Sequence, residues 1–333
     1  MRIKYLLLAT LIPALLLTAS CAVEPKSETH ASQDRVMQAW MRHNYPGLTT
    51  YGDTDLYVLS LNPGDGPAIS DSAYVFAHYV KTKLDGEVIS TNDEILAKQL
   101  GTYSVSNYYG SSIWRVDQGY LPEDLETVLR AMKSGGYAKI ALPLSASDHE
   151  FSMYSAFSGT EESYNEILEI EIDTVVNKIY AYQEQLMKDW FQRNYQVSDT
   201  AAEHLYFKKL VEKTAESDTI SEGHNIRVRY VGRLLNGQVF DTNIEDTAKF
   251  YRIWKSTGSY NAMTIAYYKD DSEQFDNNNS VVDGFGQAIQ MMNFGETAVT
   301  VFNSELGYGE KGKSPSIPEY APLYFWLYIE PKD

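Results

Sequence analysis

The amino-acid sequence predicts an α+β protein that contains two copies of one domain. Three observations lead to this prediction. Short apolar or alternating runs typical of strands occur in both halves of the chain, with only a few helical segments among them. Several sequence blocks occur twice in the same order. The chain has 333 residues, of which 44% are apolar, and this is enough for two domains with their own cores.

Residues 1–21 are expected to be a targeting signal and not part of the fold. Arg2 and Lys4 give a charged start, and the apolar run at residues 5–17 is too short for a membrane-spanning helix. Small residues then lead to Cys21, the only cysteine. This pattern resembles a bacterial lipoprotein signal. It implies that Cys21 is lipidated and that the protein is exported and anchored in the cell envelope, at the periplasmic or surface side of an outer membrane. The alternative is a plain secretory signal with an incidental cysteine.

Residues 22–50 are expected to form a polar tether followed by an N-terminal helix. The apolar residues between positions 33 and 45 have helical spacing, and a Pro-Gly pair follows them as a stop signal. Strands are predicted at residues 56–59 and 74–80, with turn residues between them.

Sequence blocks of the first half reappear in the second half. The pairs are residues 40–45 with 190–195, residues 78–86 with 229–237, and residues 131–140 with 291–300, at offsets of 150, 151 and 160. Because the order is kept while the offset drifts, we expect a duplicated domain whose loops differ in length, with copies at residues 51–173 and 203–333. The period is the size of a domain, so the repeat is a tandem pair and not a solenoid.

Residues 174–202 are predicted to be a helical linker between the copies. A helix is expected over residues 175–195, with Asp173 or Thr174 as its N-terminal cap. Its apolar stripe consists of Val176, Ile179, Tyr180, Met187, Trp190 and Phe191. Either the stripe packs on its own domain, or it joins the two domains and pairs with the N-terminal helix.

The second copy shows the clearer pattern of elements. Strands are predicted at residues 204–211 and 225–235, and a sharp Asn-Gly turn then leads into a returning strand at residues 238–241. A short helix is predicted at residues 281–292. A glycine-rich loop follows, in which Tyr308 stands between two glycines, and the chain ends in an aromatic strand.

The second copy contains an ordered series of motifs: Tyr230, Phe240-Asp241, Val281-Val282-x-Gly284-Phe285, Gly307-Tyr308-Gly309, Ile317-Pro318 and Phe325. In this order the motifs resemble the FK506-binding-protein family of peptidyl-prolyl isomerases. The resemblance implies that each domain is a curved antiparallel sheet wrapped around a short helix, with a pocket between the two. It also implies which residues act: Tyr308, Asp241 and Phe240 as the catalytic set.

The resemblance further implies a pocket for the proline ring of a substrate. Its lining would be Tyr230, Val281, Val282, Phe285, Ile317 and Phe325. The hydroxyl of Tyr308 and the backbone N–H of Val282 would donate to substrate carbonyls. The family usually has tryptophan where this chain has Phe285, so the aromatic face is kept and the indole N–H is lost.

Two features depart from the family pattern. The 40 positions from Asp241 to Val281 imply an insertion at residues 244–279 beside the pocket, and residues 313–316 after Tyr308 are more polar than usual. The insertion either forms a binding lid or covers the sheet edge. Its aromatic residues are Phe250, Tyr251, Trp254, Tyr260, Tyr267, Tyr268 and Phe275.

The first copy lacks these pocket residues. Ile89 and Ser90 are expected at the positions of Phe240 and Asp241, Leu125 at that of Phe285, and Glu169 at that of Phe325. Residues 145–151 replace the Gly-Tyr-Gly loop. We therefore expect a domain that keeps the fold and has lost the pocket, with a structural, client-binding or dimerisation role.

The sequence therefore predicts a peptidyl-prolyl cis-trans isomerase that needs no cofactor and no metal. Its partners would be proline-containing unfolded or exported polypeptides, with macrolides as inhibitors and the membrane contacted only through the lipid. A net charge of −17 argues against nucleic acid as a partner. The alternatives are a non-catalytic binding lipoprotein on the same scaffold and an assembly factor held together by the helix at residues 175–195.

Overall fold

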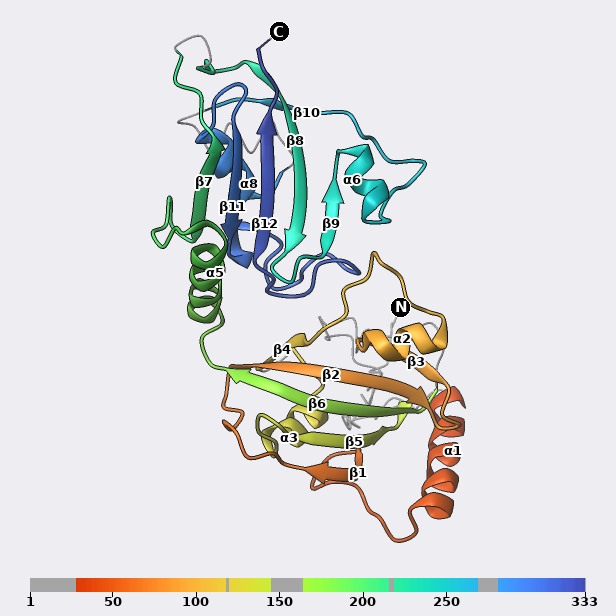
Figure 1. Ribbon diagram of the computed structural model, residues 1–333. Helices are drawn as coiled ribbons and strands as arrows, with labels where there is room; N and C mark the ends of the chain where they lie inside the picture. The colour runs from red at the N-terminus through yellow and green to blue at the C-terminus, as the bar shows by residue number, and fades with distance from the viewer. Residues whose placement is uncertain (1–27, 118–119, 145–163, 216–218, 269–280, 333) are drawn as a thin grey trace, which may run out of the picture.

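The computed structural model describes residues 28–117, 120–144, 164–215, 219–268 and 281–332. The predicted signal with Cys21, the segment 145–151 and Phe275 lie outside the described residues. Two six-stranded antiparallel sheets follow one another along the chain, and helices pack against each (Figure 1). The α+β prediction is therefore confirmed. No helix in the described part is long and apolar enough to cross a membrane.

The first half contains the elements of the first sheet. They are α1 (Glu28–Asn44), β1 (Tyr57–Asn62), β2 (Ala73–Lys83), β3 (Val88–Thr91), α2 (Glu94–Leu100), β4 (Ser112–Val116), α3 (Glu123–Arg130), β5 (Tyr137–Leu142) and β6 (Glu166–Val176). The strands are ordered β1-β5-β6-β2-β3, with β4 also paired to β2.

The second half repeats this order. Its elements are α5 (Ile179–Tyr195), β7 (Leu205–Val211), β8 (Asn225–Leu234), β9 (Val239–Thr242), α6 (Glu245–Phe250), β10 (Met263–Ala266), α8 (Asp283–Gln290), β11 (Thr297–Phe302), the short 3₁₀ helix η2 (Ser304–Leu306) and β12 (Leu323–Ile329). The strands are ordered β7-β11-β12-β8-β10, with β9 also paired to β8. The two sheets thus have the same connectivity.

Equivalent side chains make equivalent hydrogen bonds in the two copies. The indole N–H of Trp40 donates to the carbonyl of Leu84 at 3.0 Å, and that of Trp190 donates to the carbonyl of Leu235 at 3.0 Å. The side chain of Asn92 accepts from the backbone N–H of Tyr79, as that of Asn243 does from Tyr230. Shared contacts at shared offsets show that the sequence blocks mark a structural duplication.

Each domain buries apolar side chains between one short helix and its sheet. In the first, Leu125, Val128 and Leu129 of α3 lie in the core, and in the second, Phe285, Ala288 and Ile289 of α8 do. This burial removes apolar area from water and is the main stabilising contribution to each domain.

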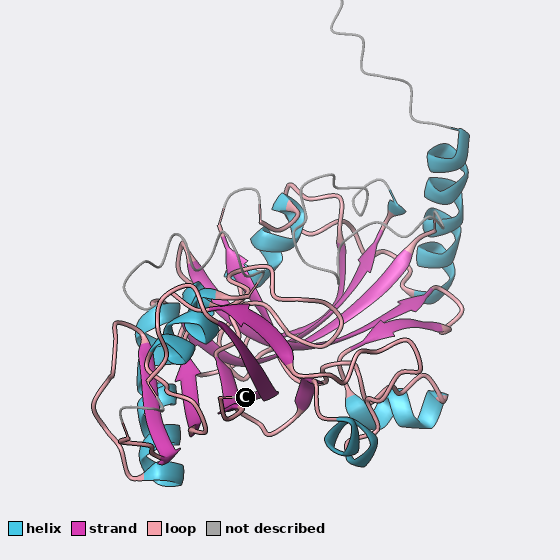
Figure 2. Ribbon diagram, turned by 90° about the horizontal axis from the view of Figure 1, so that it is seen from above, coloured by secondary structure: helices cyan, strands magenta, loops and turns pink. Residues whose placement is uncertain are grey.

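The long helices pack on the opposite faces of their own sheets. Met37 and Met41 of α1 pack on Ala141 and Ile167 of the first sheet. Met187 and Phe191 of α5 pack with side chains of the second sheet. The two helices lie at opposite sides of the molecule in Figures 1 and 2, so α5 does not pair with α1. The stripe packs on its own domain, and the start of α5 also joins the two domains, because Ile179 packs with Ile113 and the ring of Tyr182 lies 5.4 Å from that of Phe76.

The predicted start of this helix was wrong. Residues 174–176 belong to β6, where Val175 pairs with Val75, and α5 begins only at Ile179 after Lys178. Neither Asp173 nor Thr174 caps it. The cause is the β-branched pair Val175-Val176, which favours the pleated strand while the helical spacing of later residues suggested an earlier start.

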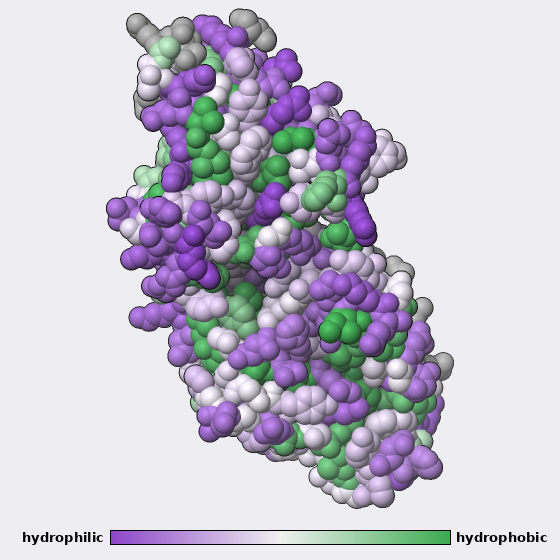
Figure 3. Space-filling model, in the orientation of Figure 1, coloured by the Kyte–Doolittle hydropathy of each residue, from purple (hydrophilic) through white to green (hydrophobic). Residues whose placement is uncertain are grey.

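The two domains touch near the start of α5, through β2 and through loops of both domains (Figure 1). The rings of Tyr74 and Tyr320 meet edge to face at 5.0 Å. The backbone N–H of Tyr108 donates to the carbonyl of Pro315 at 2.7 Å, and the amide of Gln238 donates to the carbonyl of Asn107 at 3.0 Å. In the space-filling view the surface is hollowed at this junction, and hydrophilic side chains are spread over both domains (Figure 3).

Candidate functional site

A cluster of aromatic rings lies between α8 and the second sheet. Phe325 on β12 is its centre, with ring centroids 5.2 Å from Phe285, 5.6 Å from Phe240 and 5.8 Å from Phe302. Tyr230 on β8 adds an edge-to-face contact with Phe285 at 5.7 Å. The sequence separates these residues widely, and the strand pairing brings them together.

Gly232 makes room for this cluster. It lies opposite Phe325 in the pairing of β8 with β12. A Cβ at this position would lie 2.7 Å from the ring of Phe240 and 2.8 Å from that of Phe325, which is closer than real Cβ atoms come. The absence of a side chain here therefore permits both rings to face the same space.

Tyr230 and Asp241 form the polar part of the site. The Tyr230 hydroxyl donates to Oδ2 of Asp241 at 2.9 Å. Burial, then the charge and hydrogen bond of Asp241, and the nearby Tyr308 raise the pKa of Tyr230 far above its usual range. Tyr230 is therefore a neutral phenol at physiological pH, and its hydrogen bond holds the exposed carboxylate of Asp241 at the edge of the cluster.

A cavity of about 250 Å³ opens above these residues. Tyr230, Phe240 and Asp241 form one side of it, and Pro315 and Ser316 of the loop after Tyr308 contribute another. Phe285 and Phe325, at 3% and 5% exposure, do not line this cavity but belong to the same hydrophobic cluster as Tyr230. Of the predicted aromatic residues, Tyr230 and Phe240 therefore border the open space, whereas Phe285, Phe325 and Tyr308 do not.

The loop that carries Tyr308 is fixed at its start. The side chain of Asn303 accepts hydrogen bonds from the backbone N–H groups of Glu305 and Leu306 and so caps η2. Gly309 has φ of +60°, a conformation that suits glycine. Tyr308 packs, half-buried, against the aromatic cluster, and the ammonium of Lys313 lies 5.2 Å from its ring centroid and 3.5 Å from its hydroxyl.

The remaining predicted residues take two different positions. Val281 and Val282 pack, half-buried, on the core at the start of α8, where Val282 is the N-cap residue. The N–H of Val282 has no hydrogen-bond partner among the described residues. Ile317, at 3% exposure, packs on the same core and also lines a second cavity between the domains.

The insertion supplies both a wall and an edge strand. Ile253 and Tyr260 line the cavity of about 250 Å³, whereas β10 pairs with β8 and extends the sheet. Tyr267 is buried in the core at 2% exposure, and Phe250 is 78% exposed. The aromatic composition singled out Tyr260, but nothing in the sequence distinguished Ile253.

Ser106, a residue of the first domain, also lines this cavity. No pattern in the sequence indicated that one copy would reach the site of the other. The contact depends on the loop between α2 and β4, and only the arrangement of the domains reveals it.

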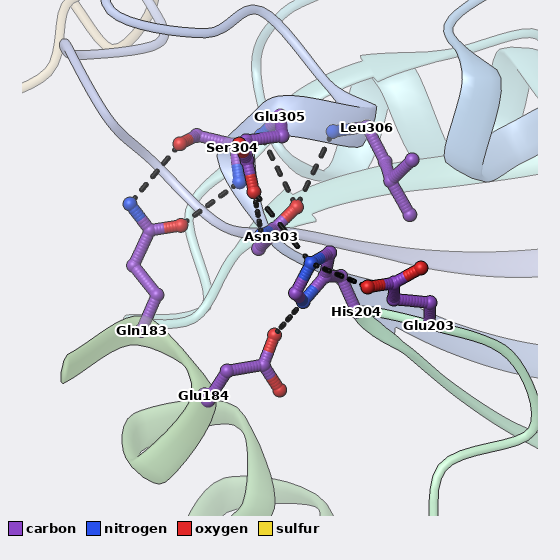
Figure 4. Close-up of polar contacts among 8 residues, drawn as sticks. All are labelled: Gln183, Glu184, Glu203, His204, Asn303, Ser304, Glu305 and Leu306. Atoms are coloured by element: carbon purple, nitrogen blue, oxygen red, sulfur yellow. Dashed lines mark hydrogen bonds and ion pairs between the residues drawn. The ribbon is translucent and has the colours of Figure 1, made fainter. Parts of the chain in front are cut away.

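A polar brace joins α5 to the start of the Tyr308 loop (Figure 4). The amide of Gln183 donates to the hydroxyl of Ser304 at 3.0 Å, and its oxygen accepts from the backbone N–H of Ser304 at 2.9 Å. Both side chains are buried. His204 contacts the carboxylate of Glu184 at 2.6 Å and that of Glu305 at 3.8 Å.

The equivalent region of the first copy differs from one expectation. Lys81 stands where the second copy has Gly232, and it pairs with Leu168, as Gly232 pairs with Phe325. Leu168, not Glu169, therefore occupies the position of Phe325. Glu169 instead lies on the other face, where it forms an ion pair with Lys139 at 2.7 Å. A shift of one residue exchanges the faces of a strand, and this explains the error.

Comparisons with known proteins agree with the geometry of the second domain. Residues 216–329 match the model of the FKBP-type peptidyl-prolyl cis-trans isomerase family. A probable FKBP-type peptidyl-prolyl cis-trans isomerase of Haemophilus influenzae is 28% identical over 115 residues, 34% of this chain and 38% of that protein. FK506-binding protein 1A of Aspergillus fumigatus is 26% identical over 108 residues, 32% of this chain and 77% of that protein.

Two solved structures are also similar. One contains the three FKBP domains of wheat FKBP73. It has a TM-score of 0.29 and 16% identity, and the aligned region covers 84% of this chain and 95% of the wheat chain. The other is a peptidyl-prolyl cis-trans isomerase of Pseudomonas syringae. It has a TM-score of 0.31 and 22% identity, and the aligned region covers 45% of this chain and 91% of the Pseudomonas chain.

The second domain matches the FKBP-type peptidyl-prolyl cis-trans isomerase family, and the match covers about a third of the chain. The chain spans about 38% of the length of the Haemophilus relative. No group of His, Cys, Asp and Glu in the described residues is arranged to hold a metal ion.

Proposed function

We propose that the second domain catalyses cis–trans isomerisation of X–Pro bonds in exported polypeptides. The observation that carries the proposal is the open cavity lined by Tyr230, Phe240 and Asp241, in a domain that matches the isomerase family. Such a cavity accepts a proline ring against aromatic faces, and the carboxylate of Asp241 stands at its edge.

The chemistry requires no nucleophile or metal. Rotation about the peptide bond has a barrier of about 18–20 kcal/mol because resonance holds the amide planar. The twisted transition state is less polar than the planar amide, so an apolar wall favours it, while fixed donors orient the flanking carbonyls. Tyr308 and the N–H of Val282 are the donors in this proposal. Each reduction of the barrier by about 1.4 kcal/mol raises the rate tenfold.

A proline-isomer-coupled peptide assay on the chain without residues 1–21 tests the proposed site. We expect turnover that a macrolide competitor inhibits, and loss of turnover when Tyr308→Phe, Asp241→Ala and Phe240→Ala are combined. Circular dichroism of the triple variant controls for folding. Turnover that is unchanged in a folded triple variant would rule out the site.

A non-catalytic binding lipoprotein is the second candidate. Ser106 of the first domain and residues of the insertion, which the family pattern lacks, line the cavity, and this observation favours binding without turnover. In that case the macrolide would bind, measured by calorimetry, and the peptide assay would give no rate above the uncatalysed one.

The cellular setting is proposed from the sequence alone. Residues 1–21 would direct export, and Cys21 would carry the lipid that holds the protein in the outer membrane, on its periplasmic or surface side. Metabolic labelling with a fatty acid, compared with a Cys21→Ser variant, tests this. Equal label in both would show that Cys21 is not the site of lipidation.

A further inference from the structure

A larger cavity, of about 550 Å³, lies between the two domains. The first domain contributes residues of β2, β3 and α2 and the loop before β4, and the second contributes residues 311–319. This volume is within the range of sites that bind ligands the size of a short peptide.

The first-domain wall is the equivalent of the isomerase cavity. Tyr79, Ile89 and Ser90 line it, at the positions that Tyr230, Phe240 and Asp241 hold in the second domain. The Tyr79 hydroxyl lies 3.2 Å from that of Ser90, as the Tyr230 hydroxyl contacts Asp241. This wall has Ile89 and Ser90 in place of the aromatic ring and the carboxylate of the second domain, and Trp114 and Leu168 of the same domain are fully buried.

The two cavities meet at one residue. Pro315 lines both of them. On the first-domain side the loop between α2 and β4 contributes Ser106 to the isomerase cavity and Asn107 to the larger cavity. Two hydrogen bonds join the domains at this loop: the N–H of Tyr108 donates to the carbonyl of Pro315, and the amide of Gln238 donates to the carbonyl of Asn107. The larger cavity is therefore the space that a chain bound in the isomerase cavity would meet beyond Pro315.

The larger cavity offers hydrogen-bonding groups that suit a peptide backbone. The hydroxyls of Thr102 and Ser112 and the amide of Asn107 line it, together with the carboxyl of Glu319. Burial raises the pKa of Glu319, and a hydrogen bond with its own backbone N–H opposes this increase. Burial, then Glu319, raises the pKa of Tyr108. The half-buried Glu319 carboxyl has further acceptor capacity, which a donor such as a peptide N–H can use.

We propose that this interdomain cavity binds, in extended form, the part of a client polypeptide that flanks the proline held in the isomerase cavity. The inference rests on the proposed function, because the proline must occupy the second domain. It assigns to the first domain a role in substrate binding. This domain would bind the residues next to the proline through hydrogen bonds to the client's backbone, which do not depend on the client's side chains.

The experiment compares two peptides with the purified full chain in detergent. One is a proline tetrapeptide, and the other carries six further residues on each side. Because a bound peptide contacts the interdomain cavity intramolecularly, we expect kcat/KM about tenfold higher for the long peptide, mainly through a lower KM.

Two variants change the interdomain cavity. Leu100→Trp, at a 44% exposed position of the cavity wall, fills part of the cavity, and Glu319→Gln removes the acceptor charge. Both should reduce the advantage of the long peptide at least about threefold while the tetrapeptide rate stays within about twofold.

Leu210→Trp is the matched control, since Leu210 is 45% exposed on β7 and lines neither cavity. It should leave both rates unchanged. Equal kcat/KM for the two peptides, or an advantage that Leu100→Trp and Glu319→Gln leave intact, would overturn the proposal.

A binding measurement separates this proposal from the proposed isomerase activity. Fluorescence anisotropy of the long peptide with its proline replaced by alanine reports the interdomain cavity alone. Binding that weakens in both variants, with no turnover of the tetrapeptide, would contradict the isomerase function while supporting the cavity. Binding that neither variant changes would overturn the cavity proposal, whatever the turnover. Self-association that Leu100→Trp abolishes would likewise overturn it in favour of a second copy as occupant.

Discussion

The two domains place different side chains on the same hydrogen-bonded frame. In the second, the rings of Phe240 and Phe325 lie against Gly232, and in the first, Ile89, Leu168 and Lys81 stand at these positions. The side chain of Lys81 forms an ion pair with Glu166 at 2.9 Å. The comparison shows why glycine is needed at this strand position of the second domain. Gly232 lets the rings of Phe240 and Phe325 pack against the strand, whereas the first domain has Lys81 at the same position and two aliphatic side chains in place of the two rings.

The largest effect is expected from breaking the buried pair of the first domain. Lys81 and Glu166 are 6% and 7% exposed, so Lys81→Met leaves a carboxylate without its partner. We expect a loss of about 3–5 kcal/mol in the free energy of unfolding of this domain. Urea denaturation measures it, and Lys83→Met, which breaks the exposed pair with Glu87, is the control and should cost below about 1 kcal/mol. Equal small losses would show that the pair does not stabilise the first domain.

The next effect is expected from adding a side chain in the second domain. Gly232→Ala places a Cβ against the rings of Phe240 and Phe325. Overpacking of this kind costs about 1–3 kcal/mol, and displacement of Phe240 should lower kcat/KM at least about tenfold. The coupled peptide assay and urea denaturation check both. Combination with Phe240→Leu should recover part of the stability, and a variant as active and stable as the original would break the comparison.

A similar loss of stability is expected from breaking the hydrogen bonds between Gln183 and Ser304 shown in Figure 4. Gln183→Leu leaves the buried N–H of Ser304 without its acceptor, at a cost of about 1–3 kcal/mol. The control is Gln185→Leu on the same helix, because Gln185 bonds only with the exposed Asp189. We expect a lower unfolding midpoint for the first variant alone, measured by thermal denaturation. An unchanged midpoint would mean that the brace does not hold the Tyr308 loop to α5.

The smallest effect concerns alkaline pH and the outer face of the first sheet. Burial and the hydrogen bond to Glu169 raise the pKa of Tyr137 to about 12. Since the unfolded value is about 10, the neutral phenol stabilises the domain fully below pH 10, and this contribution is lost as the pH rises from 10 to 12. Tyr137→Phe should therefore show a smaller decline in urea midpoint over that range. A decline as steep as that of the original protein would contradict the assignment.

Much of the fold could be predicted because the repeated blocks coincide with repeated contacts. The indole N–H groups of Trp40 and Trp190 donate to carbonyls in equivalent hairpins. The Asn-Gly turn places Phe240 and Asp241 next to Tyr230. The motif order therefore indicated which aromatic side chains meet.

The rest depends on contacts that local sequence does not encode. The position of Leu168 depends on strand register, where one residue exchanges the two faces. The start of α5 depended on whether Val175 and Val176 continue the sheet. Ile253 and Ser106 reach the cavity from an insertion and from the other domain, and no short-range pattern distinguishes them from ordinary loop residues.

The most direct test converts the second site into the first. Phe240→Ile with Asp241→Ser gives the second copy the residues Ile89 and Ser90 of the first, and it should keep the fold because the first domain holds them on the same frame. The measurement is the rate at which the chain accelerates cis–trans isomerisation of a proline tetrapeptide. We expect kcat/KM to fall at least about a hundredfold, which corresponds to about 2.7 kcal/mol of transition-state stabilisation. A folded double variant with the original rate would contradict the claim that this cavity is the isomerase site.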